Sequence, residues 1–154
     1  MVDGMLGKLT RWLRILGHDV KYSSILKDDQ LTEITKKEKR TLLTKDRGLY
    51  RQATRKRVKA YYVKGKGEVE KLAELAMRFG IQLDIDMAKS RCPRCNTKVK
   101  PIPKIEVSQR VKPKTFDYYN NFWECPKCKQ VYWKGAHWKG IRKTLRKAKR
   151  KVNH

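Results

Sequence analysis

The chain reads TLLTKDRGLYRQATRKRVKAYYV from Thr41 to Val63, and this stretch decides the predicted fold. Its apolar run at residues 41–44 is typical of a buried strand, and a second apolar run follows at residues 58–63. Between the two runs, Leu49 and Ala53 lie four residues apart, as on one face of a helix. A strand, a helix and a second strand in this order predict a small α/β layer structure with a mostly parallel sheet.

The segments on either side of this unit continue the alternation of helices and short apolar strands. Further elements predicted from spacing and from helix-starting or helix-ending residues are helices over 6–16, from residue 28 and over 69–79, and a short strand over 20–22. Period and composition both change over residues 84–90, which predicts a linker. We therefore expect an α/β domain over residues 1–86.

Two Cys-Pro-x-Cys turns follow this domain, one with Cys92 and Cys95 and one with Cys125 and Cys128. Each turn brings two thiolates together, and two such turns complete the tetrahedral site that Zn²⁺ prefers. A site with four thiolates has no open position, so the metal would be structural. Two disulfides or an iron–sulfur centre are the alternatives. The spacing predicts a four-cysteine zinc ribbon over residues 91–138.

The ribbon is expected to contain strands over 99–107, 122–123 and 131–133, where β-type residues flank the turns. The last segment, residues 139–154, has a thin apolar stripe formed by Ile141, Leu145, Ala148 and Val152. Like charges on neighbouring turns destabilise a free helix. We therefore predict a basic C-terminal helix that becomes stable when it binds phosphate groups.

The charge of the chain indicates a polyanionic partner. Forty Lys and Arg residues against 15 Asp and Glu give a formal net charge of +25, of which +9 lies in residues 1–90 and +16 in residues 91–154. A solubilising surface is the alternative, although a small domain needs a net charge of only about 2–8 for that purpose. RNA phosphates are the preferred partner. The predicted RNA contacts are Lys8, Arg11, Arg14, Lys139, Arg142, Lys143, Arg146, Lys147, Lys149, Arg150 and Lys151.

Four aspartates are candidates for a second metal site. Asp3 precedes the first helix, Asp46 follows the strand at 41–44, and Asp28 or Asp29 supplies a third carboxylate. Ligands of open α/β sheets gather at the carboxyl ends of the strands, and clustered carboxylates bind Mg²⁺ or Mn²⁺. The alternative is that these residues cap helices and close turns.

Three motifs in the same order resemble a known family. They are DGMLGKLTRWLR from Asp3 to Arg14, LLTKDR from Leu42 to Arg47, and CPKC from Cys125 with VYWKGAHW after it, ending at Trp138. Together they resemble the Mut-seven C-terminal RNase domain family, a branch of the PIN-like nucleases. The likeness runs from Asp3 to about Trp138, so the basic tail lies outside it.

The resemblance implies a PIN-like α/β domain, a zinc ribbon and metal-dependent RNase chemistry. Carried over by position, Asp3 and Asp46 would be metal ligands, and Asp28 or Asp29 would be the acidic residue near the second helix. The sequence departs from the family pattern in its very short first strand and in the loop at residues 64–67, which has no acidic residue.

Three functions are compatible with these features. The first is a metal-dependent endoribonuclease that acts on structured or ribosomal RNA. The second is a non-catalytic factor that binds ribosomal RNA or the ribosome through a degenerate nuclease site. A zinc-ribbon protein that binds DNA is less favoured. No run of about 18 apolar residues and no signal-peptide pattern is present, so we expect a cytoplasmic protein.

Overall fold

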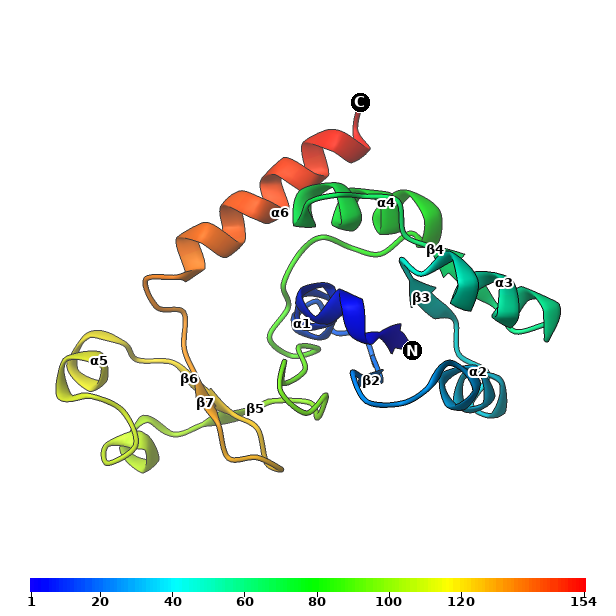
Figure 1. The fold of residues 1–154 in the computed structure, drawn as a ribbon. Helices are drawn as coiled ribbons and strands as arrows, with labels where there is room; N and C mark the ends of the chain where they lie inside the picture. The colour runs from blue at the N-terminus through cyan, green and yellow to red at the C-terminus, as the bar shows by residue number, and fades with distance from the viewer.

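A four-stranded parallel sheet organises the first half of the computed structural model, which describes residues 1–154 (Figure 1). The strand order is β2-β1-β3-β4. The strands are β1 (Val2–Asp3), β2 (Tyr22–Ser23), β3 (Leu42–Thr44) and β4 (Ala60–Tyr62). All three pairings are parallel, so the carboxyl ends of the strands lie at one edge. The predicted α/β fold class is confirmed.

Helices cover both faces of this sheet. After a 3-10 turn, η1 (Gly4–Leu6), the helices are α1 (Gly7–Ile15), α2 (Asp28–Lys37), α3 (Arg47–Arg55) and α4 (Glu68–Phe79). Neighbouring strand residues point to opposite faces. Val2 and Leu43 therefore pack with α1 and α4, whereas Met1 and Leu42 pack with α2 and α3. The result is a three-layer arrangement with one core on each side of the sheet.

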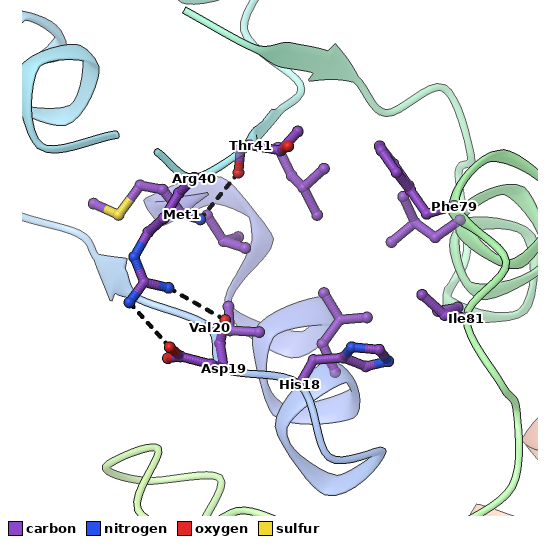
Figure 2. Close-up of a pocket in the computed structure, with 12 residues that line it drawn as sticks. Met1, His18, Asp19, Val20, Arg40, Thr41, Phe79 and Ile81 are labelled. Carbon is purple, nitrogen blue, oxygen red and sulfur yellow. Dashed lines mark hydrogen bonds and ion pairs between the residues drawn. The ribbon is translucent and has the colours of Figure 1, made fainter. Parts of the chain in front are cut away.

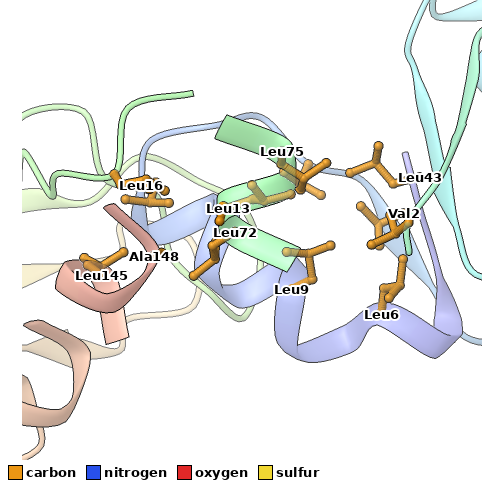
Figure 3. Packing of buried hydrophobic residues seen from close by; sticks show 14 residues of the cluster. Val2, Leu6, Leu9, Leu13, Leu16, Leu43, Leu72, Leu75, Leu145 and Ala148 are labelled. Atoms are coloured by element: carbon orange, nitrogen blue, oxygen red, sulfur yellow. The ribbon is translucent and has the colours of Figure 1, made fainter. Parts of the chain in front are cut away.

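The C-terminal helix α6 (Trp138–Val152) belongs to the first of these cores. It returns from the ribbon and lies against α4 (Figure 1). Leu145 and Ala148 are buried in the same cluster as Leu72 of α4 and Leu16 (Figure 3). The prediction that phosphate binding is needed to stabilise this helix is therefore corrected, because its thin apolar stripe is buried by the protein itself.

The ribbon is an antiparallel sheet in the order β5-β6-β7, with β5 (Lys100–Ile102), β6 (Phe122–Glu124) and β7 (Val131–Tyr132). A 3-10 turn, η2 (Lys104–Val107), and a short helix, α5 (Pro113–Tyr118), lie between β5 and β6. Of the expected strand over 99–107, only Lys100–Ile102 forms a strand. Pro103 lacks the N–H that a continuing strand would use, and the turn that follows buries Val107 beside Phe122.

The predicted linker is attached to α1. The Ser90 hydroxyl donates a hydrogen bond to the Ile15 carbonyl at 2.8 Å, and the Arg91 N–H donates one to the Arg14 carbonyl at 2.8 Å. Gly17 has a φ of +98°, and a Cβ there would lie 3.1 Å from the Lys89 carbonyl oxygen. This close approach requires glycine at the end of α1. No helix in the molecule is long and apolar enough to cross a membrane.

Candidate functional site

The carboxyl edge of the parallel sheet carries two of the predicted site residues. Asp3 ends β1, Asp46 follows β3, and Thr44 at the end of β3 connects them. The Thr44 hydroxyl donates a hydrogen bond to Asp3 Oδ2 at 2.9 Å and accepts one from the Asp46 N–H at 2.9 Å. Thr44 is completely buried, so its hydroxyl fixes the positions of both aspartates. The sequence does not single out Thr44, because threonine is common in strands.

Asp46 also has a structural role. Its Oδ1 accepts a hydrogen bond from the Leu49 N–H at 3.1 Å, which makes Asp46 the N-cap of α3. The helix cap that the sequence offers as an alternative is therefore present. The other carboxylate oxygen forms no hydrogen bond or ion pair within the protein. One oxygen of Asp46 thus remains available to a cation.

Asp28, at the start of α2, lies close enough to Asp3 and Asp46 to feel their charges. Burial raises the pKa of Asp28 above its ordinary value. The negative charges of Asp46, Asp3 and Asp29 raise it further. No Lys or Arg forms an ion pair with Asp3, Asp28 or Asp46, although Lys and Arg outnumber acidic residues 40 to 15. A divalent cation would relieve the repulsion among these three carboxylates.

Asp28 and Asp29 are both exposed, but only the side chain of Asp29 has hydrogen-bond and ion-pair partners. Its side chain is 81% exposed, and its Oδ1 accepts hydrogen bonds from Gln52 and, at 3.2 Å, from Lys56. Both partners lie on or just after α3, so Asp29 ties α2 to α3. Asp28 therefore experiences the charges of Asp3 and Asp46, whereas Asp29 is paired with residues of α3 and its end.

The four cysteines form a tighter cluster than these carboxylates do. They are the one group of three or more potential metal ligands whose ligand atoms all lie within 4.8 Å of one another. The Sγ atoms of Cys92 and Cys128 are 3.6 Å apart, and those of Cys95 and Cys125 are 3.3 Å apart. The cluster is thus able to bind a metal such as zinc, whereas the aspartates do not form such a group.

Matching backbone turns present the four sulfur atoms. In the first turn, the Asn96 N–H donates to the Cys92 carbonyl at 2.8 Å, and in the second the Lys129 N–H donates to the Cys125 carbonyl at 2.9 Å. Asn96 and Lys129 both have positive φ, at 72° and 64°. Asparagine tolerates this conformation better than lysine does. The Tyr132 hydroxyl lies 2.9 Å from Cys92 Sγ, where it can orient that ligand.

The first cysteine turn is joined to the α/β domain by Arg14 and Asn96. Arg14 Nη1 donates to the Pro93 carbonyl at 2.9 Å, while its Nε and Nη2 donate to the Val20 carbonyl at 3.0 and 2.8 Å. Asn96 Oδ1 accepts a hydrogen bond from the Val20 N–H at 3.0 Å. Arg14 is only 8% exposed. Its prediction as an RNA contact is therefore corrected, because its guanidinium is used to hold the first cysteine turn against the segment that follows α1.

The remaining predicted RNA contacts lie at the surface. Lys8 and Arg11 are exposed on α1. On α6, Lys149 pairs with Asp84, and Lys151 lies 4.0 Å from Glu70. The unpaired and exposed cations of α6 are Lys139, Arg142, Lys143, Arg146, Lys147 and Arg150.

A groove of about 510 Å³ runs along the start of α6. Its lining includes Arg142, Arg146 and Lys139, together with the indole of Trp138. The Lys134 ammonium lies 5.4 Å from the centre of the Trp138 ring. Cations beside an aromatic face are typical of nucleic-acid-binding surfaces.

A smaller cavity of about 270 Å³ lies at the other edge of the sheet, where β1 and β3 begin (Figure 2). Its lining is mostly apolar and includes Phe79 and Ile81. Arg40 pairs with Asp19 at 3.1 Å on one side of it. This cavity lies at the opposite ends of the strands from the three aspartates and has no acidic cluster.

Comparison with known proteins identifies the family. A family model described as the Mut7-C RNAse domain matches residues 1–145, which extends the likeness from the sequence motifs into α6. No curated protein and no solved structure is similar enough to match the chain. The matched residues include the parallel sheet with its aspartates, all four cysteines and the first half of α6. The chain therefore belongs to the Mut7-C RNAse domain family.

Proposed function

We propose that this protein is a metal-dependent endoribonuclease that acts on structured RNA, with ribosomal RNA as the leading candidate. One observation carries the proposal. Asp3, Asp28 and Asp46 lie at the carboxyl edge of the sheet without a cationic partner, in a chain of formal net charge +25. The pKa of Asp28 is raised by burial and by its acidic neighbours, so the group is poised for a cation. Membership of an RNase domain family supports the reaction type.

The donor set fits a hard divalent cation. Carboxylate oxygens are the ligands that Mg²⁺ and Mn²⁺ prefer, and Mg²⁺ uses one or two carboxylates together with water and substrate phosphates. Asp3 and Asp46 would hold the ion, with Asp28 as the third acidic group. When bound, the ion supplies water activation and stabilises negative charge on the phosphate.

The protein's own residues would position the metal-binding carboxylates and bind the RNA phosphates. The Thr44 hydroxyl holds the Asp3 carboxylate, and the N-cap hydrogen bond to Leu49 holds that of Asp46. Lys8 lies in the first turn of α1, which begins at the same edge of the sheet as Asp3. It is exposed and unpaired, so it can contact a phosphate of the bound RNA. The exposed cations of α6 would hold more distant phosphates.

The four cysteines would bind one structural Zn²⁺. Four thiolates close the coordination sphere, so this metal has no position for a substrate. Its role is to fold the ribbon and thereby fix the first cysteine turn against Arg14 and Asn96. Metal analysis of protein purified without added zinc should give one Zn²⁺ per chain, and two disulfides in that protein would contradict this assignment.

A non-catalytic factor that binds ribosomal RNA is the second candidate. The carboxylates favour it, since the four cysteines, and not the aspartates, form a close group of potential metal ligands. The size of the positive charge also favours stable binding. In that case the acidic edge would be a remnant of the nuclease site.

Asp46→Asn separates the two candidates. Asparagine also caps helices well, so α3 should keep its start. If the protein is a nuclease, Mg²⁺- or Mn²⁺-dependent cleavage of copurified RNA should fall by at least about 10–100-fold, with RNA affinity unchanged or slightly higher. The matched control is Asp117→Asn, at an exposed acidic residue of the ribbon. Equal inertness of the wild type and Asp46→Asn with both metals would leave the binding factor as the correct assignment.

A further inference from the structure

A surface hollow of about 410 Å³ is lined by residues of α3 and of the edge strand β4, including Arg47, the residue after Asp46. Its lining combines three tyrosines with three cations: Arg47, Tyr50, Arg51, Tyr61, Tyr62 and Lys64. No acidic residue lines it. Its volume is within the range of about 300–1,000 Å³ that is usual for small-molecule sites.

Two aromatic rings and a guanidinium form flat surfaces in this hollow. The rings of Tyr50 and Tyr62 have centroids 6.2 Å apart and planes at 68°, so they meet as two walls of a corner. The guanidinium carbon of Arg47 lies 5.1 Å from the centre of the Tyr62 ring. Tyrosine rings and arginine guanidinium planes are the surfaces on which proteins stack unpaired bases.

The back of the hollow is held rigidly. The Tyr61 hydroxyl donates to Glu74 Oε1 at 2.8 Å, and the same carboxylate accepts from the N–H groups of Lys64 and Gly65. Burial alone would raise the pKa of Glu74, but these hydrogen bonds outweigh it and lower the pKa. Lys45 Nζ donates to the Gly65 carbonyl at 2.6 Å. The loop after β4 is therefore fixed before any ligand binds.

The cations of the hollow are free to bind phosphate. Arg47, Arg51 and Lys64 are exposed, and none of them forms an ion pair. Arg47 is the first residue of α3 and directly follows Asp46, the cap of that helix. A nucleotide held here would therefore place its phosphate near the carboxyl edge of the sheet.

We propose that this hollow is a subsite for one unpaired nucleotide of single-stranded RNA, with the base on Tyr50 and Tyr62 and the phosphate on the three cations. A base in a duplex has both faces stacked, so it cannot enter the corner between the rings. This subsite rests on the proposed function, because it assumes that the ligand is RNA. It narrows the substrate to RNA with an unpaired nucleotide at the acidic edge. Binding at this subsite does not require cleavage.

The test measures binding to full-length protein in the Asp46→Asn background, so that cleavage does not interfere. The probes are a single-stranded oligoribonucleotide, a series of the same strand with one abasic position moved along it, and the corresponding duplex. Tyr50→Leu and Tyr62→Leu, which keep apolar bulk, should each weaken single-strand binding by roughly 5- to 150-fold. Duplex binding should change by less than about twofold, because a duplex offers no base to stack.

Two comparisons separate stacking from loss of structure. Tyr62→Phe keeps the ring and should bind the single strand within about twofold of the parent protein. Tyr118→Leu removes the exposed tyrosine of α5 and should have no effect. In the abasic series, the strand with its abasic site at one particular position should bind the parent protein more weakly than the other strands do. Tyr62→Leu should abolish this difference in affinity between the strands. Thermal unfolding establishes that each variant is folded.

Charge substitutions provide a second line of evidence that does not depend on the tyrosines. Arg47→Gln and Arg51→Gln should weaken single-strand binding and reduce its salt dependence, whereas Lys37→Gln on the exposed face of α2 should not. The proposal is overturned if both leucine variants bind the single strand as the parent does, or if duplex binding falls equally. Loss of cleavage in Asp46→Asn alone tests the proposed function and leaves these binding results unaffected.

Discussion

Leu145→Ala should destabilise the protein in the absence of any RNA. Leu145 is 6% exposed and lies in the core shared by α1, α4 and α6 (Figure 3). The substitution removes three carbon atoms, each worth roughly 0.8 kcal/mol of transfer free energy, or about 2.4 kcal/mol together. A cavity adds to this loss, and buried Leu→Ala changes typically cost about 2–5 kcal/mol. Because α6 packs on one side only, its neighbours can partly close the gap, and we expect about 2–3.5 kcal/mol.

Urea unfolding of RNA-free protein measures this loss, and thermal unfolding should show a Tm lower by roughly 5–12 °C. Lys147→Ala is the matched control on the exposed face of the same helix and should change the free energy of unfolding by less than about 0.5 kcal/mol. Equal stability of Leu145→Ala and Lys147→Ala would refute the expected loss. In that case α6 would not be docked on α4 without RNA.

Three further changes test other parts of the molecule. Arg14→Lys removes hydrogen bonds to two backbone carbonyls and should lower the free energy of unfolding in urea by about 2–4 kcal/mol. An unchanged urea midpoint would show that Arg14 does not join the first cysteine turn to the segment after α1. The pKa of Asp28 is raised in the folded state, so the stability of the metal-free protein should fall as pH rises from the ordinary pKa of 3.8 through the folded value. Asp28→Asn should remove this fall. An identical pH profile of the variant would contradict the charge coupling of Asp28 to its acidic neighbours. Neutralising Arg142 and Arg146 together should reduce the slope of log affinity against log salt by about 1.4–1.8, whereas neutralising the paired Lys151 should reduce it less.

Several features could be predicted from the sequence because their signals are local. The apolar run at residues 41–44 predicts a buried strand, and Leu42 and Leu43 do lie in cores on opposite faces of the sheet. The two Cys-Pro-x-Cys turns predict the cysteine cluster from spacing alone. The apolar stripe of α6 has helical spacing that marks its buried side. Its predicted instability was wrong, since α4 provides the partner that the sequence does not show.

Other features depend on contacts between residues far apart in the chain. Lys8, Arg11 and Arg14 follow one another at intervals of three residues, and the first two are exposed. Arg14 is buried because it contacts Pro93, 79 residues away, which the sequence does not show. The choice between Asp28 and Asp29 depends on Gln52 and Lys56, which lie 23 and 27 residues after Asp29 and pair with it. In the hollow beside Asp46, Tyr50 and Tyr62 come from different elements, and neither is conspicuous in its own segment.

The proposed nuclease activity requires a divalent cation at the carboxyl edge of the sheet. The most direct measurement is an anomalous difference map from crystals of the full chain soaked in Mn²⁺, compared with crystals of Asp46→Asn treated in the same way. We predict Mn²⁺ in direct contact with the carboxylates of Asp3 and Asp46 and near Asp28, with the signal lost in the variant. An edge without Mn²⁺ in the wild type, or with a Lys or Arg side chain bridging Asp3 and Asp46, would contradict a metal-dependent nuclease site.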